Sequence, residues 1–421
     1  MLKFSTFTSL ILFFCIAIEH SSSQTRTGSS TISGIVSDSV TKSPLFNANV
    51  FLQSTTRGAS SGDDGRYLLQ NIPSGEYQIV FSLVGYERVV KQMTIPDSAS
   101  LVMNVALSPR EIQADAVDVV ASYEDEWKEY LPRFRAELFG ASRHIDRCQI
   151  LNPEVLQFST DPTGMVLHAR ADSSLIIENY GLGYRITLQL ERFLSNYSKG
   201  HFEMVGYALF QDLPARDDHQ REEWQQNRQK SYRASLRYFL SNLVKRKLDE
   251  TGYRLTKGTL QELIRGKGEE IEEESITVKP NPRRGYFAVN FNAPFLRIDP
   301  QQRLGDWPSS LFQVIDLPVA SEPQGDQAQG TQTFRLPPTR VGRFRDLMRT
   351  DQVTIKYEST PVSVGIQTPV STAIISTPAG SITVNERGDI LSSRTLTLRG
   401  WWANRRFADE LPKDYSPEKE R

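Results

Sequence analysis

Cysteine is scarce in this chain of 421 residues, which contains two cysteines and five histidines. Cys15 lies in an apolar N-terminal stretch that we expect to be cleaved, so Cys148 would be the one thiol of the mature chain. A single thiol cannot form an internal disulfide, and the fold must then depend on its core. Because Ile150 and Leu151 follow closely, we predict that Cys148 is a buried packing thiol rather than a reactive one.

The chain also has almost no excess of charge of either sign. It contains 49 lysines and arginines and 50 acidic residues, so the formal net charge is −1. A near-neutral chain has no electrostatic basis for binding nucleic acid. Beyond the N-terminal stretch, no apolar run reaches the roughly 18 residues that suggest a membrane-spanning helix. We therefore predict no nucleic-acid partner and no transmembrane helix.

The first 23 residues have the pattern of a secretory signal peptide. Lys3 supplies the positive charge, residues 4–18 are apolar, and Ser21-Ser22-Ser23 offers small residues for cleavage. A lipid anchor at Cys15 is the alternative, although the residue before it is not small. The remaining chain of about 400 residues is long enough for two or three domains.

Residues 31–108 alternate short apolar stretches with turn residues, which is typical of a β-sandwich. Residues 31–37 alternate apolar and polar side chains, as a half-buried strand does. Glycine, proline and aspartate separate the stretches at 62–65, 73–75 and 96–97. We expect strands at 31–37, 48–52, 66–70, 77–83, 88–95 and 101–107.

Short motifs in this stretch belong to a known pattern: Gly34-Ile-Val-Ser-Asp38, Pro44-Leu-Phe-Asn-Ala48-Asn-Val50, Gly58, Asp64-Gly65-Arg-Tyr67, Ile72-Pro73-Ser-Gly75-Glu-Tyr77 and Gly85-Tyr86. With them, residues 31–108 resemble the carboxypeptidase-regulatory-like family, a transthyretin-like β-sandwich. In that family the module is an accessory domain. It occurs beside peptidases, at the front of TonB-dependent transporters and in many exported proteins of Bacteroidetes type. The resemblance implies export and a packing or binding role, and it implies no peptidase activity.

Residues 109–122 are predicted to be a linker, and residues 123–415 an α+β domain of unknown function. Apolar side chains recur at helical spacing over 124–139, where Pro132 is expected to kink or divide the helix. An apolar stripe predicts one long helix over 217–250. The predicted fold class is therefore mainly β with α+β: an N-terminal transthyretin-like β-sandwich followed by a larger α+β domain with one long helix.

Most of the remaining chain is predicted to form strands. We expect them at 155–158, 165–170, 175–178, 184–193, 201–213, 253–256, 285–291, 353–358, 373–376, 381–384 and 391–398. Two polar stretches, the acidic run at 269–274 and residues 321–332, are predicted to be exposed loops.

Four groups of residues in the second region also resemble a family of exported proteins of Bacteroidetes type. They are Trp127 with Phe134 and Phe139-Gly140, Cys148-Gln-Ile-Leu-Asn152-Pro153, Leu182-Gly183-Tyr184, and Arg406-Phe-Ala-Asp409-Glu-Leu411-Pro412 with Tyr415. That family carries the same N-terminal module and has no assigned activity. The resemblance implies an envelope location and transfers no functional residue.

One string, His219-Gln-Arg-Glu222, suggests zinc chemistry, because metallocarboxypeptidases hold zinc with His-x-x-Glu and a later histidine. A catalytic zinc needs three protein ligands and one open position. His219 is the last histidine of the chain, so the third ligand is missing. Acidic neighbours suit the start of a helix. We therefore predict a solvated helix start, with no metal and no other cofactor.

Two further strings resemble nucleophilic sites. Gly58-Ala-Ser60-Ser-Gly62 matches G-x-S-x-G, but that motif functions only at a strand-to-helix turn and here lies in a predicted hairpin. His144 and Cys148 are four residues apart, which admits a Cys/His pair or, as we favour, an ordinary polar turn. Gly181-Leu-Gly183 lacks the third glycine of a dinucleotide-binding loop.

Trp401, Trp402, Arg405 and Arg406 are the candidate interaction residues, because tryptophan and arginine anchor many protein interfaces and can form cation–π pairs. The alternative, which we favour, is that this segment packs onto its own domain.

These features predict an exported protein of the cell envelope, in the periplasm or at the outer membrane of a Gram-negative bacterium, where it could associate peripherally. The predicted function is non-enzymatic binding of an envelope protein or glycan, with no catalytic residue. The alternative is an envelope hydrolase that acts on glycan or peptide through carboxylates scattered along the sequence.

Overall fold

The computed structural model describes residues 29–110, 123–196, 201–282, 285–300, 330–335, 352–357, 373–377, 380–391 and 396–417. The predicted signal peptide with Cys15, and residues 111–122 of the predicted linker, lie outside these ranges. We call residues 29–110 the module and the described residues from 123 onward the body. Among the described residues, no helix is long and apolar enough to cross a membrane.

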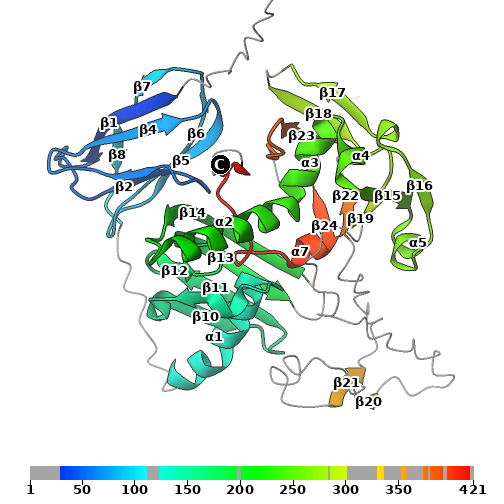
Figure 1. The fold of residues 1–421 in the computed structure, drawn as a ribbon. Coiled ribbons are helices and arrows are strands. Elements are labelled where there is room, and N and C mark those ends of the chain that lie inside the picture. Colours follow the sequence, from blue (N-terminus) through cyan, green and yellow to red (C-terminus); the bar gives the residue numbers. More distant parts are fainter. Residues whose placement is uncertain are drawn as a thin grey trace, which may run out of the picture.

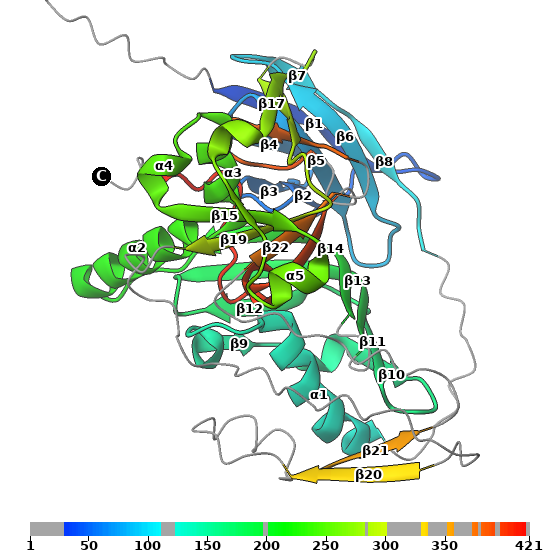
Figure 2. The same ribbon diagram turned by 90° about the vertical axis from the view of Figure 1, so that its right-hand side faces the viewer.

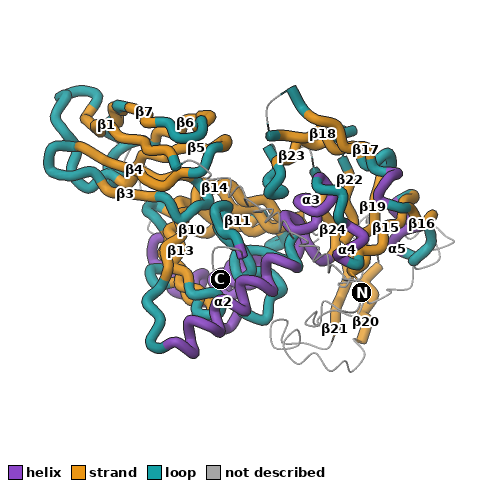
Figure 3. Tube along the Cα trace, turned by 45° about the horizontal axis from the view of Figure 1, so that its top comes forward, coloured by secondary structure: helices purple, strands orange, loops and turns teal. Residues whose placement is uncertain are grey.

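The module is a sandwich of two sheets, as the sequence predicts (Figure 1). One sheet has the order β4–β1–β7 with β8 also pairing β1, and the other has the order β3–β2–β5–β6. Figure 3 shows the module built from strands and loops, with the helices confined to the body. The strands are β1 Ser30–Asp38, β2 Asn49–Leu52, β3 Gly58–Ser60, β4 Arg66–Ile72, β5 Gly75–Ser82, β6 Val89–Ile95, β7 Ser100–Val102 and β8 Val105–Leu107.

The first part of the body is a long antiparallel sheet covered by helix α1 (Tyr123–Phe139), which stays one helix in spite of Pro132. The strand β13 (Tyr184–Asn196) organises this sheet because β11, β12 and β14 all pair with it. The other elements are η1 Ile145–Arg147, β9 Cys148–Ile150, η2 Pro153–Val155, β10 Leu156–Thr160, β11 Val166–Ala171, β12 Leu175–Asn179 and β14 His201–Asp212.

The second part of the body joins helices to two further sheets, of order β16–β15–β19–β22–β24 and β17–β18–β23, while β20 and β21 form a separate pair. The helices are α2 Asp218–Arg233, α3 Leu236–Val244, α4 Leu248–Thr251, α5 Leu260–Ile264 and α7 Trp401–Asn404. The strands and the 3-10 turn are β15 Tyr253–Gly258, β16 Glu269–Ile271, η3 Glu273–Ser275, β17 Thr277–Pro280, β18 Tyr286–Asn290, β19 Phe295–Pro300, β20 Gly330–Arg335, β21 Gln352–Tyr357, β22 Ala373–Ser376, β23 Ile382–Asn385 and β24 Thr397–Gly400.

Among the described residues there are three hydrophobic cores, one in the module and two in the body. The first body core lies between α1 and the β13 sheet, and includes Phe134, Phe139 and Phe193. The second body core lies under α3 and includes Phe239 and Trp402. The predicted fold class, a β-sandwich followed by an α+β region, is confirmed.

The prediction of one long helix over 217–250 is wrong, because the structure has three helices there. Ser235 ends the first by capping the second, since its hydroxyl accepts the backbone N–H of Tyr238 at 3.1 Å. The break exposes the carbonyl of Ala234, which then accepts the indole N–H groups of Trp401 and Trp402. Tertiary hydrogen bonds therefore compensate for the interrupted helix.

The prediction of a solvated loop at 269–274 is also wrong. Residues 269–271 form β16 on β15, and Lys257 pairs with Glu269 at 3.0 Å. Glu273 is buried, and its carboxylate accepts the backbone N–H of Leu248 at 3.0 Å. Of the predicted loop at 321–332, only 330–332 are described, and they lie in β20. The strand expected at 391–398 is shorter and begins later, as β24.

Candidate functional site

The module is fixed to the body through the outer face of its β3–β2–β5–β6 sheet. Phe51 and Val80 are cross-strand partners that point away from the module core, yet they are 1% and 0% exposed. A Cβ added at Gly58 would lie 2.9 Å from the side chain of Leu209 in β14. Both views place β14 next to this sheet (Figure 1 and Figure 2). The body therefore covers this face of the sandwich.

Backbone hydrogen bonds strengthen this docking at the β2–β3 turn. The N–H of Ser54 donates to Ala208 at 2.7 Å, and the N–H of Phe210 donates to Thr55 at 2.9 Å. On the other side of the turn, the N–H of Lys413 donates to the carbonyl of Ser54 at 2.6 Å. The turn thus lies between β14 and the C-terminal segment, and its backbone groups are hydrogen-bonded to both.

Asp414 provides the charged contact at the same turn. Its side chain is 3% exposed and accepts the Thr56 backbone N–H at 2.9 Å and the Thr56 hydroxyl at 2.5 Å. The guanidinium Nε of Arg57 lies 3.3 Å from the same carboxylate. A buried carboxylate with two hydrogen-bond donors and a guanidinium beside it is a strong contact, because each hydrogen bond to a charged group is stronger than one between neutral groups. Asp414 therefore fixes the module on the body.

A further contact joins the module to the β23 turn of the body. Arg387 lies beside Gly75 and Tyr77 of β5, and it pairs with Asp389 at 3.4 Å. Burial raises the pKa of Tyr77, so its phenol is protonated at neutral pH. The module thus contacts both parts of the body, and its orientation is set at several separate points.

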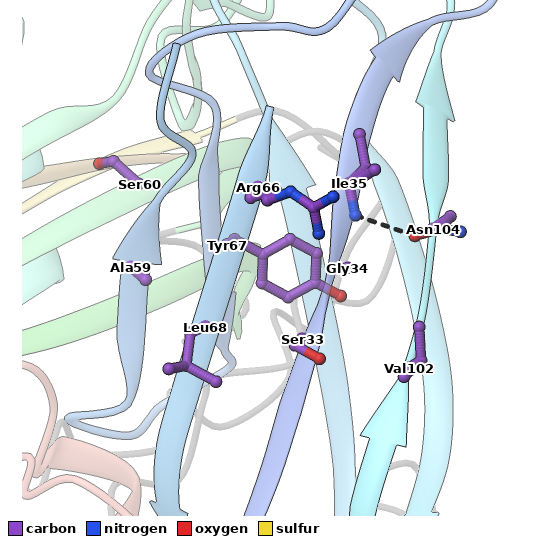
Figure 4. A pocket seen from close by; sticks show the side chains of 10 residues that line it. All are labelled: Ser33, Gly34, Ile35, Ala59, Ser60, Arg66, Tyr67, Leu68, Val102 and Asn104. Atoms are coloured by element: carbon purple, nitrogen blue, oxygen red, sulfur yellow. Dashed lines mark hydrogen bonds between the residues drawn. The ribbon is translucent and has the colours of Figure 1, made fainter. Parts of the chain in front are cut away.

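The opposite face of the module, formed by β4, β1 and β7, is open. It contains a shallow concavity of about 620 Å³. Leu68, Ser33 and Val102 lie side by side across these three strands (Figure 4). Leu68 is 50% exposed and Val102 is 75% exposed. Two apolar side chains therefore flank one hydroxyl on an accessible sheet surface.

The concavity exists because the chain leaves the ladder between β7 and β8. There the carbonyl of Met103 passes so close to β1 that a Cβ at Gly34 would lie 1.9 Å from it. The hydroxyl of Tyr67 donates to that carbonyl at 2.8 Å. The side chain of Asn104 replaces the missing backbone partner and accepts the N–H of Ile35 at 2.9 Å (Figure 4). Glycine at position 34 is thus required by this close approach.

The C-terminal segment, residues 401–417, contributes to both body cores and also contacts the module. Trp401 and Trp402 belong to the second body core. Arg406 forms an ion pair with Glu137 of α1. The segment then reaches the module through Asp414, and Figure 1 shows it running from α7 toward the module.

The candidate interaction residues are largely buried in these contacts, as the packing alternative expects. Trp401 and Trp402 are 6% and 5% exposed. Arg405 forms an ion pair with Asp409 at 3.2 Å, and the guanidinium of Arg406 lies over the ring of Phe202. An interaction of these four residues with a partner stays a prediction.

His144 and Cys148 lie on either side of η1, and both side chains are 3% exposed. Burial raises the pKa of the Cys148 thiol to about 12, and it lowers the pKa of His144 to about 4. Both groups are therefore neutral at pH 7. A nucleophilic Cys/His pair requires a thiolate, so this arrangement favours the polar turn, and the prediction of a buried packing thiol is confirmed.

The remaining candidate strings have structural roles. His219 and Glu222 lie in the first turns of α2, which Asp217 caps by accepting the N–H of Gln220 at 2.7 Å. No group of three metal-ligating side chains occurs in the described ranges. Gly58 and Ser60 lie in β3, not at a strand-to-helix turn. Gly183 has a φ of +71°, and Trp224 packs directly on it.

The open face of the module was missed by sequence reasoning, although a signal for it exists. Tyr67-Leu68-Leu69 interrupts the alternation of apolar and polar residues in β4. Tyr67 and Leu69 point into the core, so the apolar residue between them must point out. Asp414 had no comparable signal, because its partners Thr56 and Arg57 are more than three hundred residues away in the sequence.

Residues 32–119 match the family model of the CarboxypepD_reg-like domain. The predicted resemblance of residues 31–108 is thereby confirmed, and it fits a non-enzymatic binding role. No curated protein matches the chain.

Among solved structures, the chain is similar to the major pilin subunit of Bacillus cereus, with 15% identity, 20% of this chain and 31% of that chain covered, and a TM-score of 0.18. The group B streptococcus pilus 2b backbone protein is 18% identical, with 20% of this chain and 42% of that chain covered and a TM-score of 0.17. A DUF3823 family protein from Parabacteroides merdae is 13% identical, with 44% of this chain and 81% of that chain covered and a TM-score of 0.16. The chain thus spans less than half the length of either pilus protein, and TM-scores this low carry no conclusion about function.

Proposed function

We propose that this chain is a non-enzymatic binding protein of the cell envelope, which contacts a partner protein through the open face of its module. The single observation that carries this proposal is the asymmetry of the sandwich. One outer face is covered by the body at Phe51 and Val80, while the other leaves Leu68 and Val102 accessible.

The open face has the composition of a small protein-binding surface. Single exposed apolar residues are ordinary, but here Leu68 and Val102 flank the same residue, Ser33, on adjacent strands. Arg66 and Asn104 add polar groups at the rim of the concavity. An apolar centre with a polar rim is typical of interfaces between proteins.

The docking of the module supports the proposal by keeping this surface in one orientation. Contacts at the β2–β3 turn, at Asp414 and at Arg387 hold the module on the body. A partner that binds a rigid surface has less conformational entropy to overcome. It can also contact the body at the same time.

The location remains part of this proposal. The signal-peptide pattern at residues 1–23 supports export, and the family of the module supports an envelope location, in the periplasm or at the outer membrane of a Gram-negative bacterium. Fractionation of source cells, with detection of the chain in each fraction, tests it. Recovery in the cytosol with an uncleaved N-terminus would contradict it.

The binding test is cross-linking in the source envelope followed by identification of the captured protein. We expect the unmodified chain to capture a protein and Leu68→Glu to lose it, because a charge would be desolvated in the contact. Val84→Glu is the matched control, since Val84 is 87% exposed in the β5–β6 turn, away from the open face. Equal capture by all three chains, or no captured protein, would overturn the proposal.

The hydrolase alternative requires two carboxylates that converge on one concavity. The concavity on the module contains none, and a second one beside α2 contains Glu178 alone. No specific observation among the described residues therefore favours hydrolysis.

A further inference from the structure

A second concavity, of about 260 Å³, lies on the body, far from the open face of the module in sequence. It is formed where the turn after β12 meets the β14–α2 connection and the first turns of α2. Its polar and aromatic lining consists of Glu178, Tyr180, Arg185, Arg216, Gln220 and Trp224. These side chains come from β12, β13 and α2 and from the segments after β12 and before α2, so the sheet and the helix must be packed together before the concavity exists.

Glu178 provides a fixed negative charge in this lining. It is 6% exposed, and its carboxylate accepts the Tyr180 hydroxyl and the Nε of Arg185, the latter at 2.9 Å. The Tyr180 hydrogen bond is the main cause that lowers the pKa of Glu178. Glu178 is therefore ionised at neutral pH, and Arg185 balances its charge. It orients its neighbours and is not suited to donate a proton.

Arg216 brings a second positive charge to the concavity. Its backbone N–H donates to the side-chain oxygen of Gln220 at 2.9 Å, and its Nε lies 3.4 Å from the same oxygen. Within the described ranges, no acidic side chain forms an ion pair with Arg216. Since Glu178 and Arg185 cancel, the lining has a net charge of about +1, which favours an anionic group on the ligand.

The aromatic side of the concavity is held in place by hydrogen bonds. The Tyr180 ring is 38% exposed, and its hydroxyl is fixed on Glu178. The carbonyl of Tyr180 accepts the indole N–H of Trp224 at 2.8 Å, so the backbone below the ring is also fixed. A rigid, partly exposed aromatic ring among planar polar side chains offers an apolar face to a sugar ring and hydrogen bonds to its hydroxyls.

We propose that this concavity binds one carboxylated sugar residue, a uronic acid. The carboxylate is placed at Arg216, the hydroxyls at Arg185 and Gln220, and the apolar face of the sugar at Tyr180. The volume of about 260 Å³ lies below the roughly 300–1,000 Å³ of pockets for drug-sized ligands, which limits the ligand to about one sugar ring. The N-terminus of α2 contributes little, because Asp217 already caps it. The proposal does not depend on the open face of the module.

The test is a calorimetric titration of the full chain with methyl galacturonide, with methyl galactoside as the neutral analogue and with inorganic phosphate as a simple anion. We expect the galacturonide to bind, the galactoside to bind about tenfold more weakly, and phosphate to bind no better than the galactoside, because the site needs both the charge and the sugar ring. Equal affinity for galacturonide and galactoside, tighter binding of phosphate than of galacturonide, or no binding of galacturonide, would each overturn the proposal.

Two variants locate the binding. Arg216→Gln should weaken the galacturonide about tenfold, and its side chain is exposed, so the fold should tolerate the change. Arg221→Gln is the matched control, because Arg221 lies on the same helix but pairs with Asp218 outside the lining. If Arg216→Gln binds as well as the unmodified chain, the proposal fails. Leu68→Glu should leave this titration unchanged, which separates this test from that of the module.

Discussion

Replacement of Asp414 by alanine should loosen the module from the body. The change removes a carboxylate that is 3% exposed and that accepts two hydrogen bonds from Thr56. It also leaves Arg57 without its ion-pair partner. Loss of one member of a buried pair costs about 3–5 kcal/mol, because the remaining group stays desolvated. The side chain of Arg57 is 31% exposed and can be rehydrated, so we expect a cost near the lower limit, about 3 kcal/mol.

Glu191→Ala is the matched control for this change. Glu191 forms an ion pair with Arg88 across the same contact between body and module, but its side chain is 41% exposed. An exposed pair of this kind contributes less than about 1 kcal/mol. The comparison therefore separates a buried carboxylate from an exposed one at a single interface.

Hydrogen exchange of the backbone amides measures the effect locally. The amides of Ser54, Phe210 and Lys413 bridge the module and the body, so they should exchange faster in Asp414→Ala by the factor that corresponds to the lost free energy. About 3 kcal/mol corresponds to a factor of roughly 100. The reasoning is refuted if Asp414→Ala changes these rates no more than Glu191→Ala does.

Three further predictions concern the body. Cys148, whose pKa burial raises to about 12, should resist thiol reagents at pH 8 until the protein is unfolded; rapid labelling of Cys148 in the folded chain would contradict this. Burial lowers the pKa of His144 to about 4, while the same side chain in the unfolded protein has its ordinary pKa of about 6.5. Between these two pH values the unfolded protein therefore binds one more proton than the folded protein. The free energy of unfolding should fall by up to about 3 kcal/mol as the pH falls through that range. A midpoint near 6.5 for His144 in an NMR titration would show that this is wrong. Gly183→Ala should destabilise the fold by about 2 kcal/mol more than Gly285→Ala, because both glycines have positive φ but only a Cβ at position 183 would meet Trp224, at 2.3 Å; equal melting temperatures would contradict it.

The sequence predicts individual elements well where the pattern is local. The alternation over 184–193 predicts β13, and turn residues separate the strands of the module, because strand periodicity and turn chemistry depend on near neighbours. The prediction of one long helix is wrong at Ser235, because a local feature there outweighs the longer apolar pattern. An apolar stripe continues across the break, while the capping preference of one serine decides the geometry.

Contacts between distant segments could not be predicted from these patterns. Nothing in the sequence shows that β13 pairs with three strands, or that Asp414 reaches Thr56. The sequence does contain one signal of such a contact. The uninterrupted apolar triplets Val50-Phe51-Leu52 and Ile79-Val80-Phe81 indicate strands covered on both faces, and the structure shows that the body covers them.

The two proposed sites differ in how far the sequence predicts them. The open face depends on an apolar residue at an outward position of β4, which the sequence can indicate. The concavity beside α2 depends on Glu178 and Arg216 being brought together by the packing of a helix on a sheet. The spacing of Glu178 and Arg216 along the chain does not indicate that they lie close together in the fold.

The C-terminal segment has a consequence for the order of folding. During synthesis, the module, the β13 sheet and helices α2 to α4 all leave the ribosome before Trp401 and Asp414 do. Domains generally begin to fold as they are made, so the module core can form early, while both body cores still lack the side chains that this segment contributes, Trp401, Trp402, Phe407 and Ala408. The last step of assembly should then be the docking of residues 401–417. A kinetic experiment would detect it as a late phase that Asp414→Ala alters and that substitutions inside the module core leave unchanged.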